Sequence, residues 1–236
     1  MIKVTVGLII AMEEEFSSLE SYISGRREIF IKGQRFVVGK INKVKIAVAL
    51  AGIGKVNAAR TTTTLSQNFS PECIISTGVA GGLGKLPKLS IFIADGLVQH
   101  DIDLTSFGRA KGVLPGMDSP IIRTTIEIKN MLKKVSSSAN IGIIATGDQF
   151  IASEEKAKEI AEEFGALACD MESAAVAQVA KLEGIPFGVI RVISDDAGQN
   201  AHEDFSVFLE KAASYQCLFI SKPFQHIKET LKMMLA

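Results

Sequence analysis

The sequence contains no tryptophan, few other aromatic residues and only three cysteines. The cysteines (Cys73, Cys169 and Cys217) are scattered, with neither a CxxC pair nor the spacing of metal ligands. This excludes a disulfide framework and predicts a reduced, cytoplasmic location. Because tryptophan is absent, a stacking surface for a planar ligand must come from phenylalanine.

An excess of charge of one sign is also lacking, since 26 basic side chains balance 26 acidic ones. The chain therefore has no basic field of the kind that binds nucleic acids or acidic membranes. No apolar run reaches the length of a transmembrane helix. The first apolar run ends in Glu13–Glu15, without the basic region or cleavage site of a signal peptide. We expect neither a nucleic-acid nor a membrane partner.

Internal repeats, low-complexity segments and Pro/Gly/Ser-rich linkers are absent as well. The sequence therefore predicts a single domain over residues 1–236. A chain of this length buries roughly 70–75% of its unfolded surface, so its core needs neither disulfides nor metals for stability.

Short apolar segments rich in β-branched residues alternate with helical patterns. Strands, several of them without polar alternation, are predicted at 4–10, 44–50, 73–77, 91–98, 141–145 and 187–193. Helices are predicted at 55–65, 153–164, 172–182 and 205–220. This alternation predicts an α/β fold with helices on both faces of the sheet.

The segment Ser106–Pro120 differs from the rest. It contains Gly108, Gly112, Pro115 and Gly116, so it cannot be regular throughout. A long irregular segment in a compact domain is usually functional or lies at an interface.

Polar residues follow several predicted strands, at the sheet edge where α/β proteins bind ligands. They lie at 12–15, 76–82, 146–151 and 194–196. Each group has a simpler explanation. Glutamates favour helix starts, glycines form tight turns, and Ser194–Asp195 and Asp170–Glu172 could be helix caps. The glycines fit neither a GxGxxG nor a P-loop motif. The recurrence of carboxylates at one expected edge nevertheless favours a catalytic site.

Motifs spread along the chain add a resemblance. In order, they are Ala11–Glu15, Gly52–Ala59, Thr77–Gly82, His100–Asp103, Phe107–Gly108, Leu114–Gly116, Thr146–Asp148, Asp170–Glu172 and Arg191–Asp195. Together they closely resemble the bacterial 5′-methylthioadenosine/S-adenosylhomocysteine nucleosidases, over about residues 3–220.

The resemblance implies a nucleoside phosphorylase-like fold. This is a three-layer α/β/α sandwich around a central mixed, partly barrelled sheet, in a chain that forms a homodimer. We expect no cofactor. No metal is expected either, because His100, His202 and His226 lack ligand spacing.

The resemblance also implies catalytic roles. Asp195 would protonate purine N7 as the general acid, with Ser194 orienting its carboxylate. Glu15 would hold and activate the attacking water, although spacing alone does not choose it over its two neighbours. Glu172 would bind the ribose hydroxyls, and Arg191 would help to position the water and Glu172.

Further positions are implied for substrate binding. Phe150 would stack on adenine, the backbone of Ile151 would read the base edge, and Met171 would pack under the sugar. Val79, Ala80 and Gly81 would line the nucleoside site, with Val79 standing where some family members carry a hydroxyl residue. The 5′ pocket would comprise Met12, Ile53 and Phe205, closed by the partner subunit's equivalents of Leu104, Phe107 and Pro115.

This chemistry is consistent on independent grounds. Adenine leaves poorly as an anion, and a positioned acid supplies roughly 10²–10⁴-fold in rate. A carboxylate on the opposite face can take a proton from the attacking water, as in inverting glycosidases. Asp195 must then have a pKa raised from about 3.9.

Three alternatives remain open. A phosphorylase of the same fold would use phosphate, but Glu15 and the apolar Val79 and Ala80 disfavour an anion there. A non-catalytic nucleoside-binding module would not need all three carboxylates. Within the hydrolases, an aminodeoxyfutalosine-type nucleoside of menaquinone synthesis competes with methylthioadenosine, S-adenosylhomocysteine and 5′-deoxyadenosine as substrate.

Overall fold

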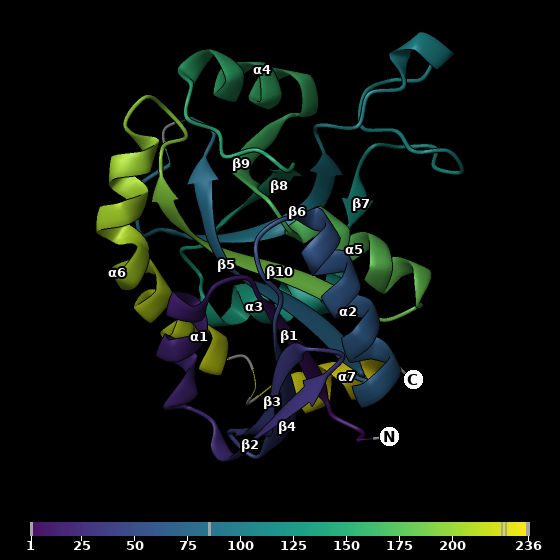
Figure 1. Cartoon of the computed structure of the whole chain (residues 1–236), viewed down its shortest axis with the longest axis vertical. Coiled ribbons are helices and arrows are strands. Elements are labelled where there is room, and N and C mark those ends of the chain that lie inside the picture. The colour runs from purple at the N-terminus through teal and green to yellow at the C-terminus, as the bar shows by residue number, and fades with distance from the viewer. Residues whose placement is uncertain (1, 85, 223, 225, 235–236) are drawn as a thin grey trace.

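A ten-stranded mixed sheet forms the centre of the computed structural model, which describes residues 2–84, 86–222, 224 and 226–234 (Figure 1). The strands are β1 Val6–Ile10, β2 Ser24–Ile31, β3 Gln34–Ile41, β4 Val44–Leu50, β5 Cys73–Gly82, β6 Ile91–Gln99, β7 Ile122–Arg123, β8 Asn140–Thr146, β9 Ala166–Asp170 and β10 Phe187–Asp195. The helices are α1 Glu13–Glu20, α2 Lys55–Phe69, α3 Ile126–Val135, α4 Glu154–Phe164, α5 Ser173–Leu182, α6 Ala201–Ser221 and α7 Ile227–Met234, with a 3₁₀ turn η1 at Thr105–Phe107.

Half of the sheet closes on itself. The strand order is β10-β6-β8-β9-β5-β1-β4-β3-β2, and an additional pairing of β10 with β5 joins five strands into a barrel. β5 belongs to both halves, since it also pairs in parallel with β1 at the start of the open extension. The predicted mixed, partly barrelled sheet is confirmed.

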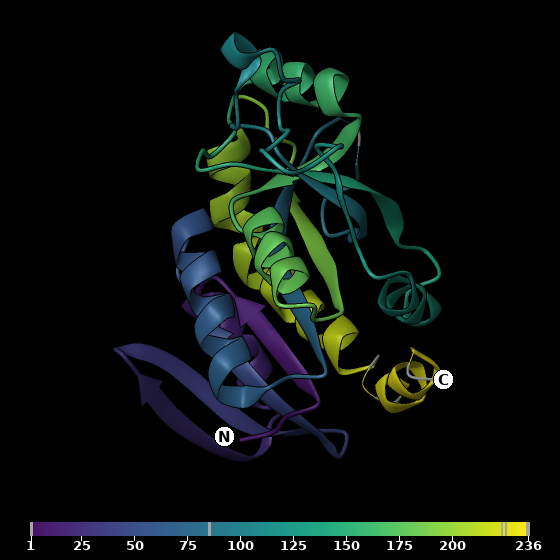
Figure 2. The same ribbon diagram turned by 90° about the vertical axis from the view of Figure 1, so that its right-hand side faces the viewer.

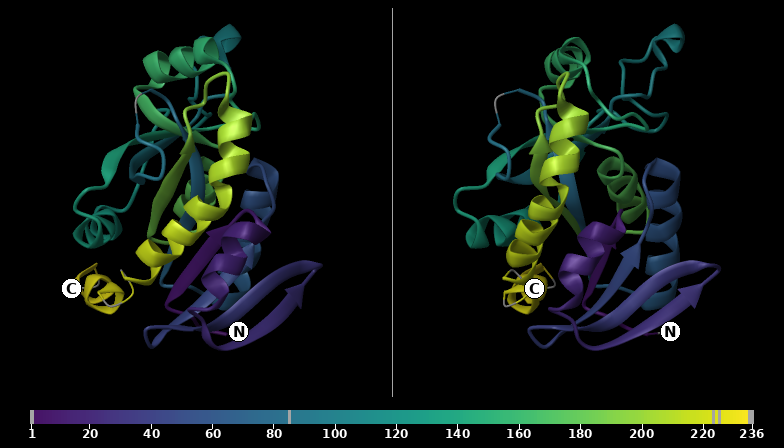
Figure 3. Two further views of the ribbon diagram at one scale, coloured as in Figure 1. Left: turned by 90° about the vertical axis from the view of Figure 1, so that its left-hand side faces the viewer. Right: turned by 60° about the vertical axis from the view of Figure 1, so that its left-hand side comes forward.

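Helices cover both faces of this sheet, as the alternating pattern predicts. α2 and α5 pack side by side over one face (Figure 2). α6 lies along β10 and β5 with α1 beside it (Figure 3). Every residue of β1 and of β10 is buried; β1 is apolar throughout, and β10 is apolar except at Arg191, Ser194 and Asp195. Among the described residues, no helix is long and apolar enough to cross a membrane.

Two expectations about the strands are wrong. The strand expected to end at Thr77 continues to Gly82, so the glycine cluster lies in β5 and is not a turn after it. The hairpin β2–β3 was not predicted at all. β2 is the edge strand and is mostly exposed, so its sequence Ser-Gly-Arg-Arg-Glu-Ile-Phe-Ile carries little of the apolar signal of a buried strand.

The irregular segment is confirmed. Between β6 and β7 the chain forms only the short turn η1 and further turns up to residue 121. In Figure 1 this segment, here called the arm (residues 100–121), extends away from the body at the upper right. It is held to the rest of the chain by ion pairs of Lys111 with Glu163 of α4 (3.1 Å) and of Asp101 with Lys55 of α2 (2.6 Å).

Candidate active site

A cavity of about 380 Å³ opens where β1, β5 and β10 reach their carboxyl ends. It brings together the predicted residues Met12, Glu15, Ile53, Val79, Ala80, Gly81, Phe150, Ile151, Met171, Glu172, Arg191, Ser194, Asp195 and Phe205. It also contains residues that sequence reasoning did not assign, namely Ile9, Ala11, Ser76, Thr77, Gly78, Gln149, Cys169 and Asp170. The other predicted residues (Leu104, Phe107 and Pro115) do not line it and lie in the arm.

Glu15 is the one glutamate of its triplet that reaches the cavity. Its side chain is buried, whereas Glu13 is exposed and pairs with Arg35. The backbone N–H of Val79 donates to Glu15 Oε1 (2.9 Å), and that of Met12 donates to Oε2 (3.1 Å). Burial raises the pKa of Glu15, while the charge of Arg191 and these backbone donors oppose the rise.

Glu172 stands at the N-cap position of α5 but does not cap it with its side chain. Instead, its Oε1 accepts the backbone N–H of Gly54 (2.8 Å), from the residue before α2. Burial and the neighbouring charge of Asp170 raise the pKa of Glu172 to about 7. The capping explanation is therefore wrong for Glu172, whose carboxylate belongs to the cavity.

Asp195 ends β10 next to an irregularity in the ladder. Ile193 pairs with Ala80 and Asp195 with Gly81, so Ser194 is an extra residue in β10. Such bulges re-aim side chains near functional sites. Ser194 Oγ donates to Asp195 Oδ2 (2.8 Å), and the backbone N–H of Ala197 donates to Oδ1 (2.9 Å). Burial raises the pKa of Asp195, and the charge of exposed Asp196 adds to the rise.

Two glycines of β5 leave space for two of these carboxylates. A Cβ atom on Gly78 would lie 2.7 Å from Glu15 Oε1, and one on Gly81 would lie 2.9 Å from Asp195 Oδ1. Both distances are shorter than van der Waals contact allows. The glycine cluster is thus required by close approach of acidic side chains within a strand.

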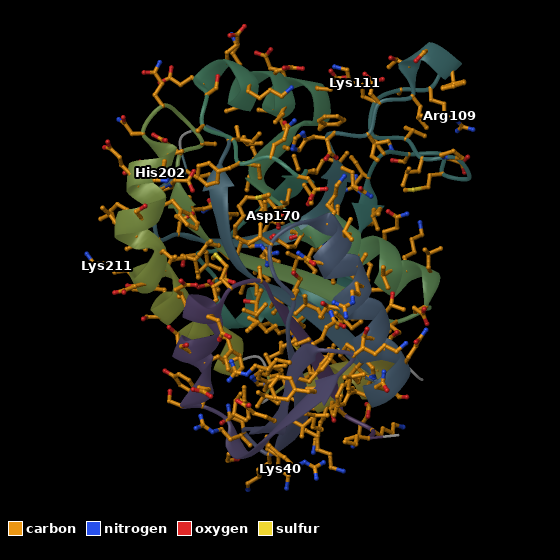
Figure 4. The ribbon with its side chains drawn as sticks, viewed as in Figure 1. Lys40, Arg109, Lys111, Asp170, His202 and Lys211 are labelled. Atoms are coloured by element: carbon orange, nitrogen blue, oxygen red, sulfur yellow. The ribbon has the colours of Figure 1, made fainter. Side chains whose placement is uncertain are left out.

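Arg191 is held by a buried network that the sequence did not reveal. Its guanidinium forms an ion pair with Asp170 (Nη2 to Oδ2, 2.9 Å), and both side chains are only 2% exposed. Arg191 Nη2 also donates to Ser76 Oγ (3.0 Å) and Ser173 Oγ (2.7 Å). Thr146 Oγ1 donates to the other oxygen of Asp170 (2.6 Å). Asp170, which also lines the cavity, therefore fixes Arg191 near the centre of the molecule (Figure 4).

Aromatic side chains form the opposite wall. The rings of Phe150 and Phe205 meet edge to face, with centroids 5.7 Å apart. Phe150 is 46% exposed and Ile53 is 53% exposed, so the rim of the cavity is apolar and open in a single chain. This rim is suited to contact either a ligand or a second subunit.

The unassigned lining residues differ in how visible they are in the sequence. Asp170 belongs to the Asp170–Glu172 segment, where the sequence alone is equally consistent with a helix cap. Thr77 Oγ1 is buried without a partner among the described residues and lines the cavity, so a polar ligand group could bond to it.

His100 is buried against Gly147, and burial lowers its pKa. Within the described residues, no group of three or more His, Cys, Asp and Glu side chains could hold a metal.

Comparisons with known proteins agree on one family. The model of the phosphorylase superfamily matches residues 5–222. A 5′-methylthioadenosine/S-adenosylhomocysteine nucleosidase of Geobacillus thermodenitrificans is 39% identical over 218 residues, covering 88% of this chain and 91% of the relative.

Two solved structures from Helicobacter pylori have the same fold. A mutant of the 5′-methylthioadenosine/S-adenosylhomocysteine nucleosidase with 5′-methylthioadenosine in its active site superimposes with a TM-score of 0.91 at 33% identity, covering 95% of this chain and all of that one. A native futalosine hydrolase superimposes with a TM-score of 0.91 at 34% identity, covering 94% and 98%.

Proposed function

Because the chain belongs to the phosphorylase superfamily and, within it, to the 5′-methylthioadenosine/S-adenosylhomocysteine nucleosidases, we propose that it hydrolyses the N-glycosidic bond of 5′-substituted adenine nucleosides. The observation that carries this proposal is the convergence of three buried carboxylates, Glu15, Glu172 and Asp195, on one apolar cavity. Burying a carboxylate costs folding free energy, so several buried carboxylates around one cavity indicate a functional site.

Asp195 is the proton donor of the reaction. As the bond between C1′ and N9 breaks, its electron pair passes into the purine, and Asp195 delivers a proton to N7 so that adenine leaves neutral. The raised pKa of Asp195 keeps a fraction of this acid protonated nearer neutral pH. Ser194 holds the carboxyl group in position through its hydroxyl.

Glu15 is the base that takes a proton from the attacking water, whose oxygen forms the new bond to C1′. Its two backbone donors leave its oxygens fixed at the end of β5. Glu172 binds the ribose hydroxyls, and Arg191 supplies positive charge beside both glutamates. After adenine departs, Glu15 releases its proton to solvent and Asp195 takes up a proton from solvent, which restores the resting enzyme.

Water rather than phosphate is the expected nucleophile. The carboxylate of Glu15 already occupies the space beside Gly78, and a buried carboxylate repels an incoming phosphate. Val79 and Ala80 add no side-chain donor, whereas phosphate sites need several. These contacts support hydrolysis over phosphorolysis.

In the proposed complex, separate groups of residues would contact the adenine, the ribose and the 5′ group of the substrate. Phe150 would stack on adenine, Ile151 would read its edge through the backbone, and Met171 would lie under the ribose. The 5′ group would lie against Met12, Ile53 and Phe205, which is suited to the thioether of methylthioadenosine and to the 5′ groups of S-adenosylhomocysteine and 5′-deoxyadenosine. The similar fold of the futalosine hydrolase keeps aminodeoxyfutalosine as the second candidate.

A second copy of the chain would complete the site. Phe107 in the arm is 81% exposed, as are Val56 of α2 (77%) and Leu182 of α5 (79%). Exposed apolar groups of this size mark interaction surfaces. We propose a homodimer in which Leu104, Phe107 and Pro115 of one subunit cover the open 5′ pocket of the other, in a cytoplasmic enzyme.

The test is adenine release, measured side by side on methylthioadenosine, S-adenosylhomocysteine, 5′-deoxyadenosine and aminodeoxyfutalosine, with and without phosphate. We expect adenine release from methylthioadenosine and from S-adenosylhomocysteine. For each substrate, the rate should be the same with and without phosphate, and the other product should be the free ribose sugar. Dependence on phosphate with formation of a ribose 1-phosphate would make the chain a phosphorylase. Tight binding of nucleosides without any adenine release would make it a binding module.

A further inference from the structure

A second cavity lies at the end of the open sheet that is opposite to the cavity with Glu15, Glu172 and Asp195. It has a volume of about 550 Å³ and is lined by Lys3, Val4, Thr5, Lys40, Lys43, Lys45, Glu72, Lys228, Leu231 and Lys232. These residues precede β1 and β5, belong to the β3–β4 hairpin and its turn, or belong to α7, so the cavity lies at the amino ends of the parallel strands. Figure 4 shows Lys40 at the lower end of the molecule and Asp170 near its centre.

The charge of this cavity is strongly one-sided. Its lining contains six lysines and one glutamate, although the whole chain has no net charge. Among the described residues, none of the six lysines forms an ion pair with a carboxylate. We call these lysines, with Glu72, the lysine cavity.

Two of the lysine pairs are unfavourable in local structure. Lys40 and Lys45 face each other directly in the antiparallel ladder of β3 and β4. Lys228 and Lys232 are four residues apart on α7. Like charges destabilise both arrangements. Two separate elements thus place repelling pairs around the same cavity.

The turn between β3 and β4 adds a third cost. Asn42 and Lys43 both have positive φ angles, of 48° and 66°, in the two-residue turn that links Ile41 to Val44. Glycine is the favoured residue at the second position of such a turn, because a side chain there is strained. Lys43 is nevertheless present, and it too lines the cavity. Local rules are broken in this way mainly where function requires it.

The shape and composition of the cavity indicate the class of ligand. Its volume lies in the range of small-molecule sites, about 300–1,000 Å³, and not of a flat membrane-binding face. No aromatic side chain lines it, so it lacks the stacking groups that bind single-stranded nucleic acid. Ammonium groups from three chain segments, namely the residues before β1, the β3–β4 hairpin and α7, suit clustered phosphate oxygens.

We propose that the lysine cavity binds a small molecule that carries several phosphate groups. The site is separate from the cavity that contains Glu15, Glu172 and Asp195, and it does not depend on the proposed hydrolysis. Bound phosphates relieve the repulsion within both lysine pairs, and they tie α7 to the β3–β4 turn. Binding therefore stabilises this end of the molecule against unfolding.

The test is isothermal titration calorimetry of inorganic tripolyphosphate with the full chain at low ionic strength. The variant Lys43→Ala/Lys45→Ala removes two charges from exposed positions of the cavity. The control variant Lys158→Ala/Lys181→Ala removes the same charge from exposed positions on α4 and α5. The far-UV circular dichroism spectrum of each variant shows that it is folded, whether or not the chain hydrolyses nucleosides.

We expect tripolyphosphate to bind the native chain and the control alike, and the cavity variant on the order of tenfold more weakly or worse. Binding should also weaken with added salt. The proposal is overturned if the native chain does not bind tripolyphosphate, or if the control variant loses as much affinity. Tighter binding of a short single-stranded RNA or of phosphatidylglycerol vesicles than of tripolyphosphate would overturn it as well.

Discussion

Burial raises the pKa of Glu15, Glu172 and Asp195 alike, but the three carboxylates have different neighbours. Asp195 accepts a hydroxyl donor and lies near Asp196, whereas Glu15 lies near Arg191. An acid must be protonated and a base ionised in the same pH range. The charge of Asp196 favours the protonated form of Asp195, whereas the charge of Arg191 favours the ionised form of Glu15, as these two roles require. Glu172 has the clearest consequence for stability.

Glu172 should make the protein less stable as the pH rises. Its pKa of about 7 in the folded chain exceeds that of an unfolded glutamate, so the folded state holds the proton more tightly. Its stabilising contribution is complete below the unfolded pKa and is lost as the pH rises through about 7. We predict that Glu172→Gln reduces the fall in unfolding free energy between about pH 5 and pH 7.5, by up to about 1.4 kcal/mol per pH unit.

Urea unfolding at several pH values measures this directly, with Glu13→Gln as the control, because Glu13 is exposed. Parallel pH profiles for the native chain and Glu172→Gln would contradict the assignment of a raised pKa to Glu172.

Asp170 should be essential to the position of Arg191. Asp170→Asn leaves a buried guanidinium without its counter-ion, which typically costs about 3–5 kcal/mol. We predict a loss of that order in urea unfolding, and a fall in kcat that Asp170→Glu partly restores. Asp196→Asn is the matched control for stability, because Asp196 is exposed and, among the described residues, accepts the backbone N–H of Gly198. Equal stability of Asp170→Asn and the control would show that the ion pair contributes little.

At the scale of elements, the start of α2 connects two parts of the site. Gly54 has a φ of 99°, a conformation that side chains rarely adopt, and its N–H holds Glu172. Asp148 accepts the next N–H, from Lys55 (2.7 Å). The turn before α2 is thus shaped by glycine so that its backbone reaches a carboxylate of α5.

Gly54→Ala should disturb this contact without affecting the core. A Cβ atom there would lie 3.1 Å from Asp148 Oδ1 in a strained conformation. We predict weaker nucleoside binding, seen as a higher KM, with a modest loss of stability of about 1–2 kcal/mol. Gly33→Ala, in the hairpin turn of β2 and β3, is the control for strain alone, since nothing lies within 4 Å of its Cβ position. An unchanged KM for Gly54→Ala would contradict the role given to this turn.

The same scale shows how far the sequence predicts the structure. Most of the buried strands and the longest helices were predictable because their apolar residues have a clear pattern, and β4 was predicted with its observed bounds, but the buried strand β9 was missed. The β2–β3 hairpin was not, because an exposed edge strand buries too little to show a pattern. Glu15 and Asp195 were predicted as site residues and line the cavity, whereas Asp170, which ends the unpredicted strand β9, was not assigned. Its role depends on Arg191, which is distant in the sequence and adjacent only in the folded chain.

At the scale of the molecule, the arm and the open rim of the cavity belong together in the proposed dimer. A single chain leaves Phe107, Ile53 and Phe150 exposed. We predict that Phe107→Ala weakens dimerisation and raises the KM for methylthioadenosine more than that for adenosine, because the lost contact covers the 5′ group. Sedimentation velocity and steady-state kinetics measure the two effects. Phe30→Ala, which removes another exposed phenylalanine (66% exposed) from β2, is the control. A chain that is monomeric and fully active would contradict the shared site.

The central claim is that Asp195 drives cleavage of the N-glycosidic bond by protonating the leaving adenine. The most direct measurement is single-turnover adenine release from methylthioadenosine by Asp195→Asn, together with its affinity for the nucleoside. We predict unchanged folding, retained binding, and a rate reduced by roughly 10²–10⁴-fold or more. Adenine release at nearly the native rate by a folded Asp195→Asn protein would contradict the claim.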